Sequence, residues 1–469
     1  MKQHLVILAD DLTGAADCAV PFVRSGFPTE VFLQPELVKE TEAPVVSVDL
    51  NTRELTPGQA VQATSRAFTL IPSTSSTVWY RKIDSTLRGN IGPDILASLR
   101  RLRDKRTIFC APAFPDTGRT TVNGKVFVNG LPLEKSGIHY RNSKSLAELF
   151  AEVGLPTKLV SLDVIRGGPA NLLNRLKSNS PVTVAILDAE TNEDLSVIAQ
   201  AGLQIRHELI FVGSAGLTHQ IAAVWGSELL QPSSRDLPPE EQPKQNSTAA
   251  LFRYSECDVP NESKIGNGLR LPDKPILIVV GSKSAVSRAQ CEQVADKGGV
   301  DVLSVKISAL KSGGGTIVDA VTRALVNRQD LVITTELPEE ISEAKVRYQS
   351  PPEANEGGSE ARSNGADRIG LASEARSTGG AVLMRNLGGI LRPFLDQFSA
   401  LILTGGETGR GVLTQSGIGR LSMMDEIEPG VTLSMSLSKP EIPIVMKAGA
   451  FGAPATLVNA LHFLRSRKR

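Results

Sequence analysis

A short segment between residues 80 and 88 concentrates side chains that could bind and activate a small anionic polyol. It follows a β-prone run at 77–80 and carries three cations, a carboxylate and two hydroxyls. The cations could hold a carboxylate by charge-assisted hydrogen bonds, and the carboxylate could accept a proton from a reacting hydroxyl. The alternative is an ordinary solvated loop, because clusters of charge usually lie on the surface. The candidate residues are Arg81, Lys82, Asp84, Ser85, Thr86 and Arg88.

Two adjacent aspartates, Asp10 and Asp11, follow the first predicted strand at residues 4–9. In open α/β sheets, ligands bind beyond the carboxyl ends of the strands, which is where these carboxylates stand. We expect at least one of them to touch the substrate or a metal-bound phosphate. The alternative is that one of them only caps the following helix or shapes the turn.

Three predicted strands in the second half of the chain run into glycine-rich turns, at Gly281, Gly405 and Gly449. The turn at Gly405 also carries an acid and a hydroxyl, Glu407 and Thr408, and opens a helix. Free backbone N–H groups at a helix N-terminus commonly hold phosphates. Each turn alone is explained by tight-turn geometry, but three of them at strand ends indicate a nucleotide pocket.

The elements that must position these residues alternate between strands and helices, which favours parallel, doubly wound sheets. A chain of 469 residues exceeds one ordinary core, so we predict two α/β domains. The first is 1–226 and the second is 275–469, with a linker at 227–274 that lacks periodic apolar residues and is partly disordered. A polar insertion is expected within the second domain, near 338–378.

The composition excludes several classes of protein. Lys and Arg number 51 against 50 Asp and Glu, so the net charge of +1 gives no reason to expect nucleic acid or an anionic membrane as partner. The four cysteines lie far apart, which argues against a zinc site or a disulfide framework. The N-terminus is too acidic for a signal peptide, and no apolar run is long enough for a membrane span. We therefore expect a cytoplasmic location.

Five motifs in order resemble the four-carbon acid sugar kinase family, which includes D-threonate, D-erythronate and 3-oxo-tetronate kinases. They are ADDLTGAAD at 9–17, KIDSTLRGN at 82–90, PAFP at 112–115 with Gly118-Arg119, GSAGL at 213–217 and GGET at 405–408. The resemblance spans both predicted domains. It implies that the first domain binds a sugar acid, that the second binds ATP, and that Mg²⁺-assisted phosphoryl transfer takes place in the cleft between them.

The resemblance also implies roles for individual residues. Asp84 is the predicted proton acceptor and Asp11 is the alternative, which spacing does not separate. Where the family tends to carry a hydroxyl in the run at 447–452, this chain has Ala448. The implied substrate-side residues are Asp10, Asp11, Arg81, Lys82, Asp84, Ser85 and Arg88. The implied ATP-side residues are Ser282, Ser284, Gly405, Gly406, Glu407, Thr408 and Gly449.

Two other functions stay open at the level of sequence. A sugar-acid sensor without catalytic activity would keep the N-terminal cluster and need no intact ATP pocket. A nicotinamide-dependent dehydrogenase would also contain βαβ units, but the G-x-G-x-x-G fingerprint after a strand is absent. The sequence does not decide the stereoisomer of the acid, the metal ligands or whether the chain forms a homo-oligomer.

Overall fold

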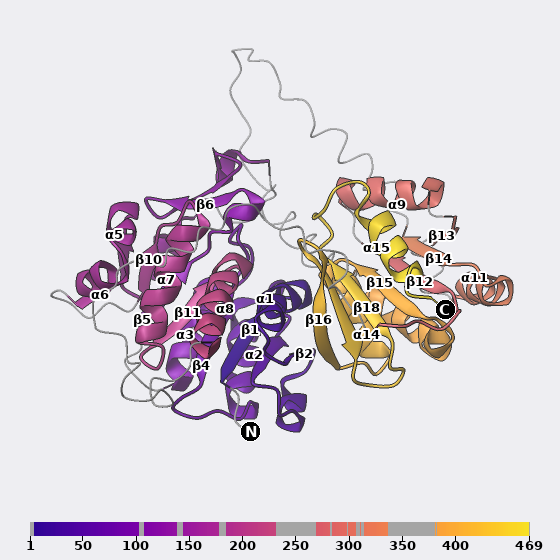
Figure 1. Ribbon diagram of the computed structural model, residues 1–469, viewed down its shortest axis with the longest axis horizontal. Coiled ribbons are helices and arrows are strands. Elements are labelled where there is room, and N and C mark those ends of the chain that lie inside the picture. The colour runs from indigo at the N-terminus through magenta and orange to yellow at the C-terminus, as the bar shows by residue number, and fades with distance from the viewer. Residues whose placement is uncertain are drawn as a thin grey trace, which may run out of the picture.

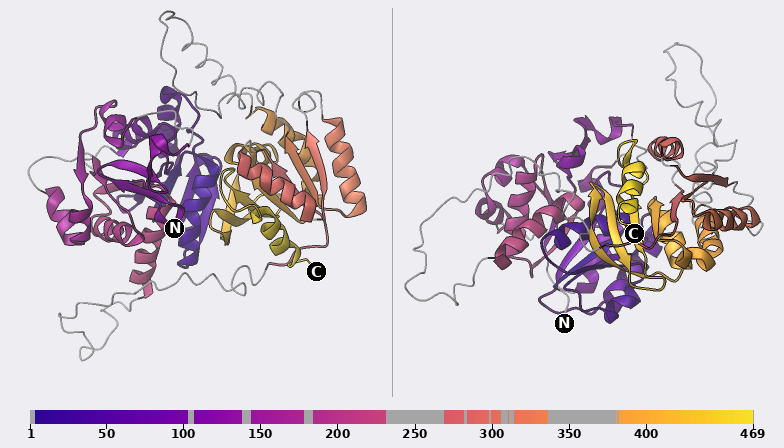
Figure 2. Two further views of the ribbon diagram at one scale, coloured as in Figure 1. Left: turned by 90° about the horizontal axis from the view of Figure 1, so that it is seen from above. Right: turned by 45° about the vertical axis from the view of Figure 1, so that its right-hand side comes forward.

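The computed structural model shows two α/β halves side by side (Figures 1 and 2). Ser282, the predicted insertion and most of the predicted linker lie outside the residues that the structure describes. The described residues are 4–102, 107–137, 144–177, 184–230, 269–281, 284–297, 299–305, 310, 314–335, 380 and 382–468.

The N-terminal half is built on eight parallel strands, which confirms the predicted α/β class. Nearly every central-strand residue is buried, because helices cover both faces of the sheet. In spatial order the strands are β2 (Thr29–Phe32), β3 (Val45–Asp49), β1 (Leu5–Ala9), β4 (Val78–Lys82), β11 (Leu209–Gly213), β5 (Thr107–Ala111), β10 (Val184–Leu187) and β9 (Thr157–Val160).

The helices of this half form two layers. One apolar core lies under α1 (Leu12–Arg24), α5 (Leu162–Arg166), α6 (Pro169–Lys177), α7 (Asn192–Gln204) and α8 (Ala215–Leu230). The opposite core lies under α2 (Pro57–Leu70), α3 (Ile91–Leu102) and α4 (Leu146–Ala151). Short 3-10 turns are η1 (Pro35–Glu40), η2 (Pro115–Thr117) and η3 (Leu133–Lys135), and a small antiparallel sheet comprises β6 (Arg119–Val122), β7 (Lys125–Val128) and β8 (Leu131–Pro132).

The C-terminal half contains seven strands, of which the last two in space are antiparallel to their neighbours. They are β13 (Asp301–Val305), β14 (Leu331–Thr335), β12 (Ile276–Val280), β15 (Ala400–Thr404), β18 (Pro443–Lys447), β17 (Val431–Ser436) and β16 (Arg420–Glu428). The helices are α9 (Ala285–Lys297), α11 (Gly315–Asn327), 382–391, α14 (Gly406–Gln415) and α15 (Thr456–Arg465), with a 3-10 turn η5 (Arg392–Gln397). Leu269 and Leu271 fall within the predicted linker but pack in the core beside α15.

The two halves share one sheet of 15 strands, a continuity that the sequence analysis did not anticipate. The connection is an antiparallel pairing of β16 with β2, in which Leu421 faces Val31. Beside it, Arg420 donates hydrogen bonds of 2.6 and 3.0 Å to the carboxylate of Glu30. Edge strands are the only places where two sheets can be joined in this way, so the seam fixes how the halves meet.

Helix α1 is buried from two sides. Its residues Leu12, Ala16 and Val20 pack into the apolar core of the C-terminal half, whereas Cys18 and Phe22 face the N-terminal core. A helix that is apolar around most of its circumference belongs in an interior. The start of α1, where Asp10 and Asp11 stand, is therefore placed at the contact between the halves.

Two carboxyl groups lie near each other at this contact, close enough for one to influence the ionisation of the other. Burial and the nearby Glu426 raise the pKa of Asp17 on α1 to about 7, and burial raises the pKa of Glu426 on β16. Glu426 also accepts a hydrogen bond of 3.1 Å from Arg24. The interface therefore holds a carboxyl group that ionises only near neutral pH.

We expect Asp17→Asn to stabilise the fold at pH 8 and to have little effect at about pH 4, below which the stability of the wild type is complete. A folded-state pKa above the ordinary 3.8 means that stability is complete at low pH and declines as the pH rises towards 7. A pKa raised from 3.8 to about 7 corresponds to at most about 4 kcal/mol at pH 8. Because Asp17 is only half-buried, solvent screening reduces the expected gain to about 1–2 kcal/mol, measured by urea unfolding of variant and wild type. An equal difference at both pH values would contradict this assignment.

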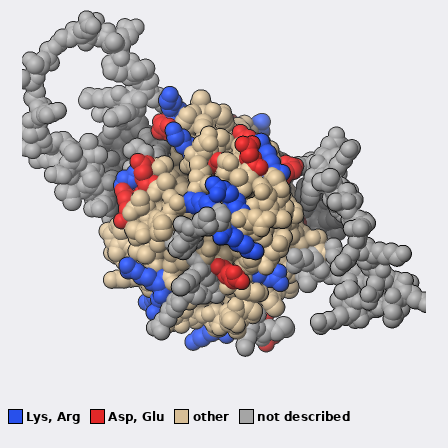
Figure 3. Space-filling model, turned by 90° about the vertical axis from the view of Figure 1, so that its left-hand side faces the viewer, with Lys and Arg blue, Asp and Glu red and all other residues tan. Residues whose placement is uncertain are grey.

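Within the described ranges, no helix has the length and apolarity needed to cross a bilayer. On the face drawn in Figure 3, basic and acidic side chains both appear among a larger area of other residues. This mixture agrees with the balanced totals of 51 basic and 50 acidic residues.

Candidate active site

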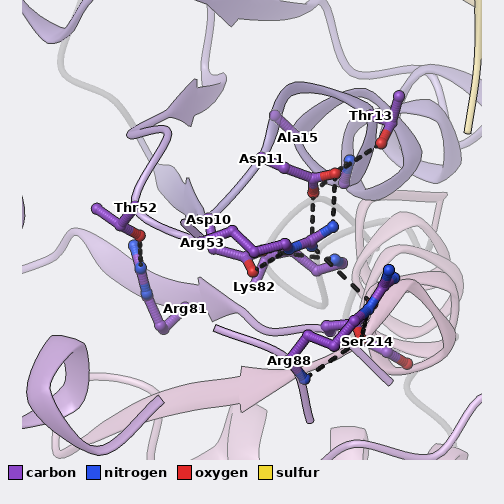
Figure 4. Close-up of polar contacts among 12 residues, drawn as sticks. Asp10, Asp11, Thr13, Ala15, Thr52, Arg53, Arg81, Lys82, Arg88 and Ser214 are labelled. Carbon is purple, nitrogen blue, oxygen red and sulfur yellow. Dashed lines mark hydrogen bonds and ion pairs between the residues drawn. The ribbon is translucent and has the colours of Figure 1, made fainter. Parts of the chain in front are cut away.

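Three neighbouring strands of the N-terminal half deliver the charged residues of the site. Asp10 and Asp11 follow β1, Lys82 ends β4, and Arg53 lies in the loop after β3 (Figure 4). Since β3, β1 and β4 are adjacent and parallel, their carboxyl ends meet at one edge of the sheet. Asp84, two residues beyond β4, completes the group, which we call the charge cluster: Asp10, Asp11, Arg53, Lys82, Asp84 and Arg88.

Arg53 is the central cation of the charge cluster. Its guanidinium donates two hydrogen bonds to Asp10, of 2.7 and 2.8 Å, and two to Asp11, both of 2.8 Å. One of its nitrogens also lies 4.0 Å from an oxygen of Asp84. A guanidinium is suited to this role because its planar fork can bond two carboxylates at once.

The loop that carries Arg53 is fixed by buried contacts. Asn90 donates hydrogen bonds of 2.7 and 2.9 Å to the carbonyl oxygens of Thr52 and Leu55. Thr52 itself donates a 3.0 Å hydrogen bond to Asp94. These contacts hold Arg53 in place, so its side chain need not be ordered by the substrate.

Arg81, which we predicted on the substrate side, lies outside the charge cluster. Its guanidinium pairs with Asp94 and donates a 2.9 Å hydrogen bond to Thr52, on the face of the sheet covered by α2 and α3. Figure 4 shows Arg81 turned towards Thr52 and away from the aspartates. Adjacent residues of a strand point to opposite faces, so Lys82 and Arg81 cannot both reach the same site.

Lys82 points to the side of α1. A Cβ atom at Gly14 would lie 2.5 Å from its Nζ, so glycine at this position makes room for the lysine. Burial alone would lower the pKa of Lys82, but Asp10 and Asp11 raise it above its ordinary value. Lys82 therefore stays a cation beside the two aspartates.

Asp11 is both a helix cap and a member of the charge cluster. It accepts hydrogen bonds of 3.1 Å from the backbone of Gly14 and 2.8 Å from the hydroxyl of Thr13. Burial would raise its pKa, but Arg53 and Lys82 outweigh this effect and lower it. The two readings of the sequence, cap and site residue, are therefore compatible.

Asp84 is held as a carboxylate by its own loop. It accepts hydrogen bonds of 2.8 and 2.9 Å from Arg88, and a further bond from the hydroxyl of Thr86. Burial would raise its pKa, but Arg53 and Arg88 lower it far below the usual range. Asp84 is thus occupied as an acceptor, while Arg88 is exposed and Ser85 half-buried beside it.

The three glycine turns of the C-terminal half lie together. The backbone N–H of Gly405 donates a 2.8 Å hydrogen bond to Lys447, immediately before the turn at Gly449. The hydroxyls of Ser284 and Ser287 donate to the carbonyl of Gly449, at 2.5 and 2.6 Å. A Cβ at Gly281 would lie 2.1 Å from the hydroxyl of Thr408, so the turn at Gly281 abuts helix α14.

The charge cluster meets these turns directly. A Cβ atom on Gly406 would lie 3.3 Å from Asp11 Oδ2 and 3.5 Å from Thr13 Oγ1. A pocket of about 140 Å³ lies at this junction. It is lined by Asp11, Leu12, Asn51, Arg53, Glu54, Gly406 and Glu407.

Comparison with known proteins identifies the family. Residues 5–221 match the family model described as a sugar-binding N-terminal domain, and residues 277–457 match that of a nucleotide-binding C-terminal domain. A curated relative from Cupriavidus necator, named D-threonate kinase, is 31% identical, with 97% of this chain and 96% of the relative covered. The chain belongs to the four-carbon acid sugar kinase family.

Other relatives of this protein are named for different four-carbon acids. A Pectobacterium atrosepticum protein named 3-oxo-tetronate kinase is 26% identical, with 96% of each chain covered. Further matches are named D-threonate kinase and D-erythronate kinase. A solved structure of a Haemophilus influenzae protein superposes with a TM-score of 0.64 at 20% identity, covering 98% of this chain and 100% of that one, and so shares the fold.

Arg53 is a site residue that was not predicted from the sequence. The residue stands alone among neutral and acidic neighbours in the run Asn51-Thr52-Arg53-Glu54, so no cluster of charge marks it. The available signal was its position, because it follows a buried strand in the same way as Asp10 and Asp11.

Proposed function

We propose that this protein transfers the γ-phosphoryl group of ATP to a terminal hydroxyl of a four-carbon sugar acid. The observation that carries the proposal is the junction at Gly406. There a carboxylate and a guanidinium of the N-terminal half line the same pocket as the glycine turn of the C-terminal half. A site for two substrates needs such a junction, because phosphoryl transfer depends mainly on positioning.

In this proposal residues 1–226 bind the sugar acid, residues 275–469 bind the nucleotide, and the reaction takes place between them. Arg88 and Lys82 attract the carboxylate of the acid, and Ser85 reads a hydroxyl. On the nucleotide side, the backbone from Gly405 to Thr408 holds phosphates at the N-terminus of α14. Ser284 and Gly449 lie in the two adjoining turns and are joined by a hydrogen bond. Ser282 lies outside the described residues.

Asp11, rather than Asp84, is the group that we propose to receive the proton of the attacking hydroxyl. Asp11 lines the pocket beside Gly406, whereas Asp84 is not among the residues that line it and serves to orient Arg88. The pKa of each carboxyl is lowered, so neither is a strong base. This suits phosphoryl transfer, in which a base contributes only about 10²–10⁴-fold.

A magnesium ion fits the same junction. Mg²⁺ is usually held by one or two carboxylates together with substrate phosphates, and Glu407 lines the pocket at the first turn of α14. We propose Glu407 as the protein ligand, with the ion neutralising charge on the phosphates.

We expect the purified chain to release ADP from Mg-ATP with one acid in a panel of D- and L-threonate, D- and L-erythronate and 3-oxo-tetronates. Asp11→Asn should lower kcat by about 10²-fold or more and leave ATP affinity unchanged. The measurement is a coupled ADP assay, with ATP binding followed by calorimetry. ATP binding without turnover on any acid would contradict the proposed substrate class, and binding of an acid without ATP binding would favour a sensor.

A further inference from the structure

The loop after β5 reaches across to the nucleotide side of the molecule. Its tip is rigid: Phe114 and Arg119 exchange backbone hydrogen bonds of 2.8 and 3.1 Å, and Gly118 adopts a left-handed φ of 71°. A Cβ at Gly118 would lie 2.0 Å from Asn129 Oδ1. Since a side chain at position 118 would clash, the loop keeps this backbone conformation and fixes the position at the start of β6 from which Arg119 extends.

The guanidinium of Arg119 stacks on an aromatic ring of the other half. Its Cζ lies 5.3 Å from the ring centroid of Phe451, in the turn that follows β18. The carbonyl oxygen of Phe451 accepts hydrogen bonds of 2.9 Å from Lys447 and 3.1 Å from Gln290. The backbone at Phe451 is therefore held next to the turn at Gly449, and the cation that stacks on its ring lies at the side proposed to bind the nucleotide.

Arg119 differs from the other arginines near the junction in having no acidic partner. Arg53 pairs with Asp10 and Asp11, and Arg88 pairs with Asp84. Within the described ranges no carboxylate forms an ion pair with Arg119, and its guanidinium donates a side-chain hydrogen bond to the carbonyl oxygen of Thr117.

One nitrogen of this guanidinium is also left without a partner. The Nε atom of Arg119 is buried and makes no hydrogen bond to any residue that the structure describes. Burial lowers the pKa of Arg119, while the charges of Asp84 and Arg88 act on it in opposite directions, as expected for a group near the charge cluster. A buried donor without an acceptor is costly and is rarely kept without a use.

We infer that Arg119 is a further catalytic residue, which donates hydrogen bonds to the phosphoryl group while it passes from ATP to the sugar acid. The inference rests on the proposed function. In that step the acceptor oxygen forms a bond to the γ-phosphorus, and the bond from phosphorus to the β,γ-bridging oxygen breaks. The electron pair stays on ADP, and the hydroxyl proton goes to Asp11. A planar, unneutralised guanidinium is suited to the charge on the equatorial oxygens.

The test compares the full-length wild type with Arg119→Ala, Arg119→Lys and the control Arg420→Ala. Arg420 also stacks across the seam, 5.7 Å from the ring centroid of Phe32, but it is paired with Glu30 and lies at the seam rather than beside the turn at Gly449. Arg119→Ala should lower kcat about 10²-fold, the effect of losing one donor to developing charge. Arg119→Lys should lower it about 10-fold, and Arg420→Ala should leave it unchanged.

A binding measurement separates this role from a structural one. ADP with aluminium fluoride mimics the phosphoryl group in transit, so Arg119→Ala should weaken its binding about 10²-fold in the presence of the acid while ADP alone binds as in wild type. Equal losses for both ligands would overturn the inference. Should the alanine variant fail to fold, an unchanged kcat in Arg119→Lys would overturn the inference instead.

The two levels of the proposal fail in different ways. Wild-type turnover that persists in Arg119→Ala would overturn the role of Arg119 alone. A wild type that is inactive on every acid would overturn the proposed function, and the role of Arg119 with it.

Discussion

Replacing Arg53 by methionine should both inactivate and destabilise this protein. Its guanidinium neutralises Asp10 and Asp11 through four hydrogen bonds of 2.7 to 2.8 Å. Without it, the buried Asp10 and the half-buried Asp11 would keep Lys82 as their neighbouring cation among the described residues, with its Nζ 4.0 Å from Asp10. Breaking a buried ion pair from one side typically costs about 3–5 kcal/mol. Because Asp11 lines the pocket, we also expect kcat/KM for the acid to fall about 10³-fold or more.

Urea unfolding and steady-state kinetics would measure both effects. Arg66→Met is a matched control, since this arginine is 68% exposed and pairs with Glu36 on the surface, where such pairs contribute about 0–1 kcal/mol. Combining Arg53→Met with Asp10→Asn removes one of the unpaired charges and should restore part of the stability without restoring activity. An active Arg53→Met enzyme would show that the charge cluster is not the site.

Replacing Gly406 by valine should abolish turnover while leaving the fold nearly as stable as before. The new side chain would start 3.3 Å from Asp11 Oδ2 and would fill the pocket between Asp11 and Glu407. Misplacing reacting groups by about 1 Å already costs about 10²-fold, and occlusion should cost more, so we expect kcat/KM to fall about 10³-fold. The urea midpoint should change little, because Gly406 is the first residue of α14 and a side chain there would extend into the pocket rather than into the apolar core.

Gly409→Ala provides the matched control in the same helix. A Cβ there would make ordinary contacts, 3.6 Å from Leu12 and 3.9 Å from Leu403, and would not enter the pocket. Its kinetics should match those of wild type. Near-normal turnover of Gly406→Val would mean that the two substrates do not meet at this junction.

The sequence was sufficient to predict the α/β class and the glycine turns, because buried strands and their terminal residues have strong local patterns. The seam between β16 and β2 was not predictable in this way. It joins Arg420 to Glu30, which are 390 residues apart. Neither strand has a local sequence pattern that specifies the strand with which it pairs. Pairing of edge strands is decided by tertiary geometry, which local propensity does not encode.

The residues of the site likewise fall into two groups: some are indicated by the local sequence, and others are recognised only from the tertiary structure. Asp10 and Asp11 were predicted because they follow the first strand, and Lys82 because it belongs to the charged segment at 80–88; the structure brings the three together. Arg81 was grouped with them by closeness in sequence, although strand alternation already indicated that its side chain faces the opposite way from Lys82. Arg53 lies in the loop after a third strand, and its role is evident only from its ion pairs with the two aspartates.

The seam between β2 and β16 also bears on how the chain is made. β2 emerges early during synthesis, yet its partner lies 390 residues later, as the contact between Glu30 and Arg420 records. Until then the N-terminal half exposes an open edge strand, Thr29–Phe32, and such edges readily pair with other chains. Completion of the C-terminal half covers that edge, so the last strands to be synthesised protect the first domain from aggregation.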